Sequence, residues 1–115
     1  MTNEQNYFDR EMNVPELVKQ VTRTISWAAE KGIFAKGTVT AQAAKVVEEA
    51  HELQDEIDGD NRAAALVKLG DVAVTIIVLA EQLGTTVEHC LKLANDKNEK
   101  RTGKMIDGTF VKDSE

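Results

Sequence analysis

The chain has 115 residues, enough for one domain, and folding would bury roughly 65% of the surface of an unfolded chain of this size. Hydrophobic residues make up 42% and charged residues 30%, which is typical of globular rather than disordered proteins. The net charge of −6 disfavours nonspecific attraction to nucleic-acid phosphate or to an anionic membrane. We therefore expect neither partner, although a divalent cation can bridge an acidic protein to a phosphorylated small molecule.

Cysteine content and the polarity of the segments further restrict the kind of protein that this sequence can encode. Cys90 is the only cysteine, so an internal disulfide is excluded, and two histidines do not supply a usual zinc ligand set. The segment Met1–Asn13 is polar and acidic, unlike a signal peptide. The longest apolar stretch, Ala63–Ala80, contains Lys68 and Asp71 and is marginal in length for a bilayer span. We expect it to form a buried helix in a cytoplasmic protein of a bacterium or its phage.

Two helices are predicted in the first half of the chain. One runs from about Val14 to Lys31, capped by Asn13 and ended by Gly32. The other runs from about Thr40 to Asp58, and Asp60 or Asn61 then caps the helix that follows. The second helix carries apolar residues at helical spacing, which predict its buried stripe: Ala43, Val46, Val47, Ala50, Leu53 and Ile57.

The third helix, about Arg62 to Leu83, is apolar on nearly all sides except for a strip of Lys68, Asp71 and Thr75. Such a helix is central in its bundle or shared with another subunit. A Thr85-Thr86-Val87-Glu88 capping box opens the fourth helix, which runs to about Arg101. An Asp-Gly turn in the tail predicts a short hairpin. The expected fold is a single all-α domain over residues 1–115, with a four-helix core and a C-terminal hairpin-like tail.

The sharpest local feature is the acidic run Glu48-Glu49-Ala50-His51-Glu52. Helical projection places Glu49, Glu52 and Glu56 on one flank, about 90° or more from the centre of the apolar stripe. The run is either a solvated acidic face or part of a site for Mg²⁺, which is bound through carboxylates and substrate phosphates. Both interpretations are open from this segment alone.

Asp71 bears on that choice, because an ionised carboxylate in an apolar helix needs a partner. Lys68, three residues away on the same strip, can pair with it. Alternatively, Asp71 faces Glu49 and Glu52 across the helix interface and completes a metal site, a known use of a bundle core. Spacing alone does not decide between the two.

Other polar residues are candidates for contacts with a ligand. The inward stripe of the fourth helix continues through Asn98 and Arg101, which either meet phosphate oxygens or emerge into solvent. Lys45, one turn before Glu49, forms a surface ion pair or contacts a phosphate. Trp27 projects about 140° from the centre of the first helix's stripe, which indicates a subunit interface or a stacking surface for a base.

Together these residues resemble the MazG-like all-α NTP pyrophosphohydrolases, small phage-type members included. The family pattern Glu-Glu-x-x-Glu is similar to Glu48–Glu52, and its Glu-x-x-Asp falls on Lys68–Asp71. The family's Asn-x-Lys…Arg segment is similar to Asn95–Arg101. The resemblance extends from about Val14 to Lys112, and the order and spacing of the motifs carry it.

The resemblance implies a function. Glu49, Glu52 and Asp71 would hold Mg²⁺, or Mn²⁺, and Glu48 or Glu49 would accept a proton from water that attacks the α-phosphorus of a nucleoside triphosphate. The products would be a nucleoside monophosphate and pyrophosphate. Family members form dimers or tetramers. The residues expected to contact substrate are Lys45, Lys68, Asn95, Lys97, Asn98, Arg101 and Trp27.

Lys68 departs from the family pattern, which has a glutamate there. Either Glu56 or Glu48 takes part instead, or Lys68 contacts phosphate, or activity is weak or lost. The phosphoribosyl-ATP branch fits less well, because the histidine expected after Asp71 is missing from Val72–Leu79. The alternative function is a catalytically weak or inactive helical oligomer that binds nucleotide or a protein partner.

Overall fold

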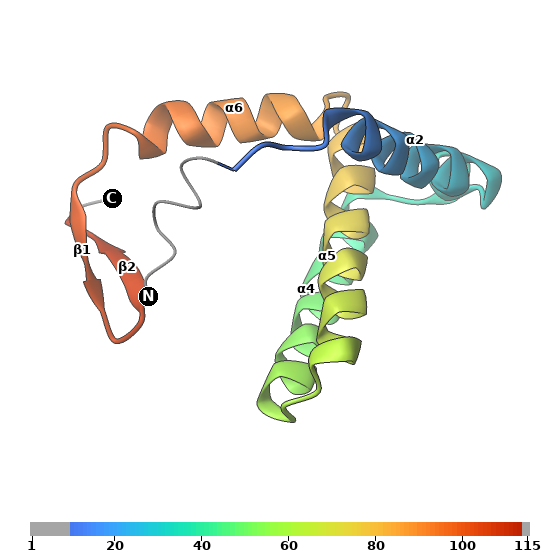
Figure 1. Ribbon diagram of the computed structural model, residues 1–115. Coiled ribbons are helices and arrows are strands. Elements are labelled where there is room, and N and C mark those ends of the chain that lie inside the picture. The colour runs from blue at the N-terminus through green and yellow to red at the C-terminus, as the bar shows by residue number, and fades with distance from the viewer. Residues whose placement is uncertain (1–9, 114–115) are drawn as a thin grey trace.

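The computed structural model describes residues 10–113, which are mostly helical (Figure 1). The elements follow in the order α2 (Val14–Glu30), α3 (Ile33–Lys36), α4 (Val39–Asp58), α5 (Arg62–Gln82), α6 (Val87–Asn98), β1 (Gly103–Ile106) and β2 (Thr109–Lys112). The expected helices and the hairpin are present, and the one-turn helix α3 is an addition that the sequence did not predict. Its four residues are too few to show a helical period.

Side-chain caps set the helix starts. In each of the four long helices an oxygen of the capping residue accepts a hydrogen bond from the backbone N–H three residues on, at 3.1–3.2 Å; the caps are Asn13, Thr38, Asn61 and Thr86. The predicted capping box was wrong by one residue, because Thr86 rather than Thr85 caps α6 and its partner is the N–H of His89. Replacing such a cap by alanine typically costs about 1 kcal/mol.

The framework is the antiparallel pair of α4 and α5, with α2 packed across α5 and α6 joined to the end of α5 (Figure 1). The Gln42 side chain of α4 donates a hydrogen bond to the Thr75 carbonyl of α5 at 3.2 Å. The fully enclosed apolar residues of the described chain are few: Ala28, Val78 and Ala80. A core this small leaves much apolar surface uncovered.

The packing face of α4 differs from the predicted stripe. Glu49 is buried, at 9% exposure, whereas Val47 and Ile57 are 54% and 56% exposed. Helical projection set Glu49 on a flank of the stripe and left open whether that flank is solvated; in the structure this side chain is enclosed. The helix turns one edge of its stripe toward α5 and leaves the other edge to solvent, since α5 alone is too narrow to cover a wide apolar face.

Helix α5 is likewise covered on one side only. Val78 is buried and Val74 is half-buried, which fits the expectation of a helix packed against others. Apolar side chains nevertheless stay exposed along the helix and at its C-cap: Leu66, Val67, Leu69, Ile76 and Leu83. By length and composition α5 is also a helix that can span a membrane, a weak indication that core helices of soluble proteins share.

The C-terminal hairpin is well defined. Met105 pairs with Phe110 and Ile106 with Thr109 in the antiparallel register. Positive φ angles of 49° at Asp107 and 84° at Gly108 suit the two-residue turn that matches the twist of paired strands. Together with α6, the hairpin extends away from the α4–α5 pair, so that the described chain forms an open arch (Figure 1).

Gly37, between α3 and α4, should be sensitive to substitution. A Cβ there would lie 2.4 Å from the Ile33 carbonyl oxygen, whereas a Cβ at Gly59 would lie 3.2 Å from the Asp55 carbonyl oxygen. We expect Gly37→Ala to lower the free energy of unfolding by about 1–3 kcal/mol through steric strain. Urea denaturation beside Gly59→Ala checks this, and equal stability of the two variants would contradict it.

Candidate functional site

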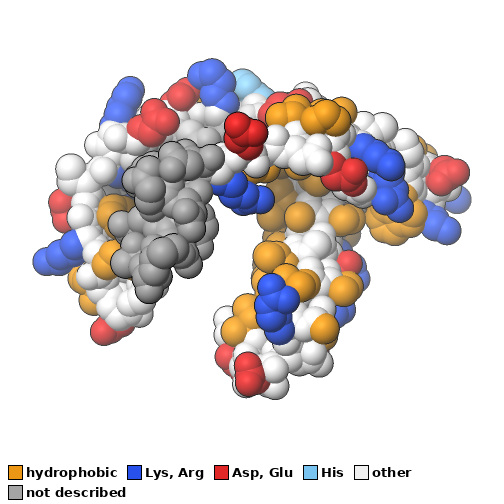
Figure 2. Space-filling view, in the orientation of Figure 1, with side chains coloured by type: hydrophobic (Ala, Val, Ile, Leu, Met, Phe, Trp, Pro, Cys, Tyr) orange, Lys and Arg blue, Asp and Glu red, His pale blue; other side chains and the backbone are white. Residues whose placement is uncertain are grey.

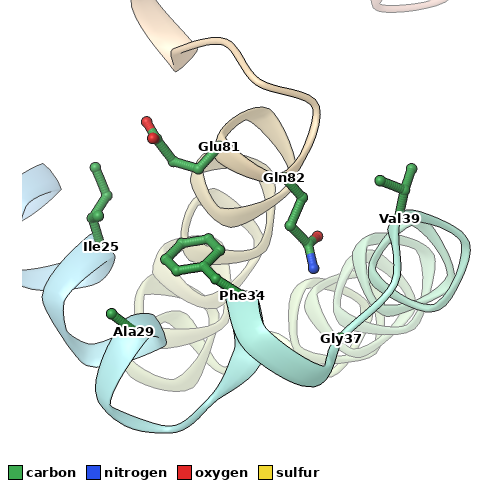
Figure 3. Close-up of a pocket in the computed structure, with 7 residues that line it drawn as sticks. All are labelled: Ile25, Ala29, Phe34, Gly37, Val39, Glu81 and Gln82. Carbon is green, nitrogen blue, oxygen red and sulfur yellow. The ribbon is translucent and has the colours of Figure 1, made fainter.

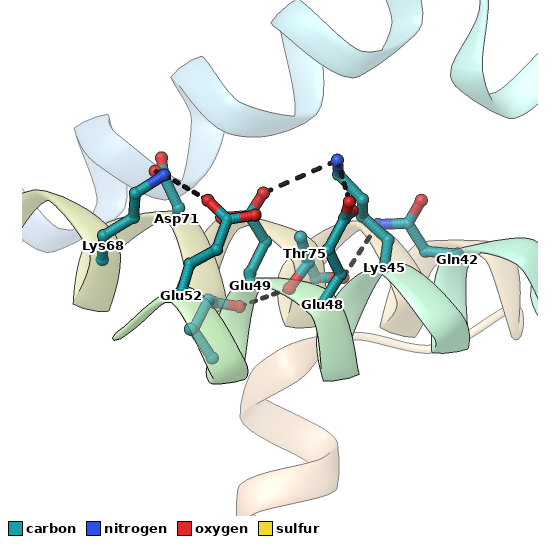
Figure 4. Close-up of polar contacts among 9 residues, drawn as sticks. Gln42, Lys45, Glu48, Glu49, Glu52, Lys68, Asp71 and Thr75 are labelled. Carbon is teal, nitrogen blue, oxygen red and sulfur yellow. Dashed lines mark hydrogen bonds and ion pairs between the residues drawn. The ribbon is translucent and has the colours of Figure 1, made fainter. Parts of the chain in front are cut away.

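A cluster of carboxylates lies on α4 where it faces α5 (Figure 4). Glu48, Glu49 and Glu52 each present an oxygen within 4.8 Å of the others. The Glu49 oxygen Oε2 is buried and has no hydrogen-bond partner among the described residues. An unpaired buried acceptor typically costs 1–3 kcal/mol, and more when it is charged. Glu49 is therefore the member of the cluster that most needs a positive partner.

Lys45 supplies part of that charge from one turn earlier in α4. Its Nζ lies 2.7 Å from a Glu48 oxygen and 3.6 Å from Oε1 of Glu49. Hydrogen bonding to Glu48, followed by charge attraction to both glutamates, raises the pKa of Lys45 above its usual value. Half of the lysine side chain is exposed, so the ion pair is a weak one that another cation can replace.

Lys68 of α5 lies between two carboxylates. Its Nζ is 2.5 Å from Oε1 of Glu52 and 3.8 Å from Oδ2 of Asp71. Its hydrogen bond to Glu52 lowers the pKa of that carboxyl, and the same bond raises the pKa of Lys68. The sequence allowed Asp71 either to pair with Lys68 or to face the glutamates. The ion pair with Lys68 is present, and Lys68 also contacts Glu52, so that it bridges the two carboxylates.

Asp71 itself lies outside the compact carboxylate cluster of the described residues, which comprises Glu48, Glu49 and Glu52. Its convergence with Glu49 and Glu52 around one ion stays a prediction. The side chains nevertheless come from facing helices and surround one ammonium group (Figure 4). Several carboxylates and two lysines within one or two turns form a charged patch in which a divalent cation and an ammonium would compete for the same oxygens.

Trp27 of α2 lies beside this patch and borders two cavities. One, of about 250 Å³, is also lined by Lys45, Gln42 and Thr75. The Trp27 side of α2 is thus adjacent to the carboxylates, and its 45% exposure leaves part of the indole ring open. Both sequence interpretations of Trp27, a stacking surface and a subunit contact, remain compatible with this position.

The other cavity beside Trp27, of about 400 Å³, is lined by Arg23 and Asp71 as well. Sequence reasoning missed Arg23. Its signal was weak, since a lone arginine one turn before Trp27 on the same side of α2 is ordinary for a solvated helix face. The structure places this guanidinium-bearing residue at the edge of the cavity that contains Asp71.

A third cavity, of about 470 Å³, lies at the junction of α2, α3 and α5 and borders none of the clustered carboxylates (Figure 3). Its lining includes Ile25, Phe34 and Gln82. The Gln82 oxygen Oε1 is buried without a partner among the described residues. We assign this cavity no part in the carboxylate site.

The predicted substrate residues of the last helical segment lie elsewhere. Asn95, Lys97 and Asn98 are on α6, which packs against α5 without a substantial contact with α4, and Arg101 follows α6. One chain alone therefore does not bring these four residues to the carboxylates. Lys45, Lys68 and Trp27 are the members of the predicted substrate set that it does place there.

Comparison of the chain with protein-family profiles, with curated proteins and with solved structures finds no match. The family resemblance therefore stays a hypothesis carried by the motif residues. What supports a function is the arrangement of charges around Glu49 and Lys68.

Lys68→Gln should raise the pKa of Glu52 toward its usual value of 4.5, because the lysine lowers it. A lowered folded-state pKa stabilises the fold above pH 4.5, and this contribution is lost as the pH falls through the lowered value. We expect the variant to lose that acid-side dependence. Carboxyl carbon NMR titration in the presence of a chelator measures it, and Lys92→Gln, which removes an exposed pair with Asp96, is the control. An unchanged Glu52 titration would contradict the pairing.

Proposed function

We propose that this protein hydrolyses a nucleoside triphosphate to the monophosphate and pyrophosphate with the help of Mg²⁺. The observation that carries the proposal is the buried, unpartnered Oε2 of Glu49 beside Glu48 and Glu52. A solvated acidic helix face, the simpler interpretation, would not require a buried carboxylate. A hard cation with oxygen ligands is the partner that such a group lacks.

The donor set suits that ion. Glu49, Glu52 and Asp71 would hold Mg²⁺, or Mn²⁺, and Lys68 would have to leave the oxygens it now contacts. When bound, the metal supplies neutralisation of phosphate charge and acidification of water. The ammonium displaced from Glu52 would then be close to the phosphate oxygens that accompany the metal.

The hydrolysis itself would use side chains of this protein. Water forms a bond to the α-phosphorus, the bond from this atom to the bridging oxygen breaks, and pyrophosphate leaves. Glu48 or Glu49 accepts the proton of the water. Lys45 and Arg23 stand beside the two cavities where they can neutralise phosphate oxygens, and Trp27 offers its exposed ring to the base.

The proposal includes a four-helix core of the all-α NTP pyrophosphatase type and a homodimer or homotetramer in the cytoplasm. The exposed apolar sides of α4 and α5 support an assembly, because monomers rarely expose contiguous apolar patches of this kind. A subunit contact would also cover part of the surface that one chain leaves open around Trp27.

The second candidate is a helical oligomer that binds nucleotide or a protein partner without turnover. The ion pairs of Lys68 with Glu52 and Asp71 favour it, because they satisfy these carboxylates without a metal. Pyrophosphate release from common and modified NTPs and dNTPs, assayed with Mg²⁺ or Mn²⁺, separates the two candidates.

Glu49→Gln should stabilise the metal-free protein and abolish its response to metal, since it removes a buried charge together with a ligand. We expect pyrophosphate release to fall by more than the roughly 10–100-fold typical of residues that only orient metal ligands. Thermal unfolding with and without Mg²⁺ and a pyrophosphate assay measure both effects. Glu88→Gln, an exposed glutamate in the first turn of α6, is the matched control. A variant that still responds to Mg²⁺ like the wild type would refute a Glu49-centred site.

Lys68→Glu should tighten Mg²⁺ binding and increase pyrophosphate release if the ammonium only replaces metal charge. The change removes the ammonium that pairs with Glu52 and Asp71 and adds a carboxylate beside the oxygens that would hold the metal. If Lys68 holds a substrate phosphate, the same change should instead raise KM or abolish turnover. Mg²⁺ titration and steady-state kinetics distinguish these results. No change in either quantity would place Lys68 outside the site.

A further inference from the structure

The chain is more extended than a compact single domain of its length. Its radius of gyration is 16.5 Å, against roughly 13 Å for a compact domain of this length. Its accessible surface is 9156 Å², against roughly 6,200 Å² for a compact monomer of the same mass. The difference of about 3,000 Å² per chain, or about 6,000 Å² for two chains, is at least as large as the roughly 2,000–5,000 Å² in total that obligate homodimers bury.

The C-terminal hairpin contributes to this excess. Its strands pack against each other and not substantially against any described helix. Met105 and Phe110, paired across the strands, are 66% and 51% exposed, and Ile106 and Val111 are each 40% exposed. A two-stranded hairpin is marginally stable in water unless it packs on another element. The hairpin has a regular turn and register but does not pack substantially on any described helix of its own chain. This indicates that it packs against another molecule.

The length of α6 indicates what fits beneath it. Its 12 residues span about 18 Å, and packed helices lie roughly 8–10 Å apart. The distance from α5 along α6 to the hairpin is thus about twice the spacing between two packed helices. By this distance, one layer of helices fits between the α4–α5 pair and the hairpin of the described chain, and Figure 2 shows a hollow beside the α4–α5 pair.

The α4–α5 pair presents a surface suited to such a layer. Exposed apolar residues recur on α4 with spacings of four, three and seven: Ala43, Val47, Ala50 and Ile57. On α5 they recur with spacings of three, four and three: Leu66, Leu69, Ala73 and Ile76. Heptad-like spacing is typical of faces that pack against other helices.

Charge indicates which helices occupy the space. Residues 97–104, the basic elbow between α6 and β1, hold four basic residues and one acidic residue, a net charge of +3. Residues 48–60, the acidic tip of the α4–α5 pair, hold seven acidic residues and no lysine or arginine. α6 leaves from the end of the α4–α5 pair opposite the acidic tip (Figure 1), so the elbow is remote from the tip of its own chain. A second copy of this chain offers the complementary acidic tip.

We propose that two copies clasp each other, each placing its α4–α5 pair antiparallel beneath the α6 of the other. The apolar rows of the two pairs meet in the centre, the hairpin closes over the outer side of the second copy, and the basic elbow contacts the acidic tip. Two-fold symmetry satisfies every contact twice. If the proposed function holds, the clasp also brings Lys97 and Arg101 of one copy toward the carboxylates of the other, which one chain alone does not achieve.

A charge exchange between copies tests the clasp independently of activity. An elbow variant carries Lys97→Glu and Lys100→Glu, and a tip variant carries Asp55→Lys and Asp58→Lys; all four side chains are exposed. Each variant alone should dimerise about 10- to 100-fold more weakly than wild type, because the mutated elbow has a net charge of −1 and repels the acidic tip, whereas the mutated tip changes from −7 to −3 and attracts the basic elbow less. An equimolar mixture should associate as a heterodimer more tightly than either variant alone, because one of its two contacts joins an unchanged elbow to an unchanged tip. Sedimentation equilibrium and native mass spectrometry measure these outcomes.

The control is Lys19→Glu on α2 with Lys31→Glu at its C-cap, which makes the same change in net charge as the elbow variant at positions outside the elbow and should dimerise like wild type. A monomeric wild type at micromolar concentration would overturn the clasp, and so would a dimer that neither variant weakens. A mixture that associates no more tightly than the single variants would also overturn it. Capture of the wild type by anionic or neutral phospholipid vesicles instead would show that a membrane covers the apolar rows. None of these results depends on pyrophosphate release.

Discussion

Burial of Glu49 in the contact between α4 and α5 is the constraint on which the site depends. Packing these helices through an interface that contains a carboxylate is costly unless the charge is compensated. Lys45 approaches one oxygen of Glu49 and leaves the other without a partner. Lys68 compensates Glu52 and Asp71 from the facing helix. The interface is thus stable enough to form without metal while retaining an oxygen that a cation would satisfy.

The same narrow interface accounts for the exposed apolar surface. Because α4 turns its acidic edge toward α5, the apolar edge with Val47 and Ile57 faces outward. A chain that buried its apolar edge internally would expose Glu49 and lose the buried, unpartnered oxygen of that residue. The proposed site and the exposed apolar surface therefore follow from one choice of packing face. In the proposed clasp, a second copy supplies the cover that this choice leaves missing.

Local signals predicted the element boundaries well, because caps act within one turn. Asn13 and Asn61 cap their helices as expected, and the Asp107-Gly108 turn forms the expected hairpin. The sequence left the burial of Glu49 undecided, since one amphipathic stripe allows several packing faces and a long-range contact selects among them. Arg23 was missed for the same reason. Its place beside Asp71 follows from how α2 crosses α5, which no short motif encodes.

Paramagnetic broadening by Mn²⁺ tests the central claim, that the carboxylates around Glu49 form a divalent-cation site, most directly. In a substoichiometric titration of the full chain followed by amide NMR, signals of residues 48–52 and 68–72 should broaden first and together. Excess Mg²⁺ should restore them. Glu49→Gln should remove the selectivity. Broadening spread over the exposed acids in proportion to their accessibility, including Asp107 and Asp113 of the hairpin region, would contradict the account.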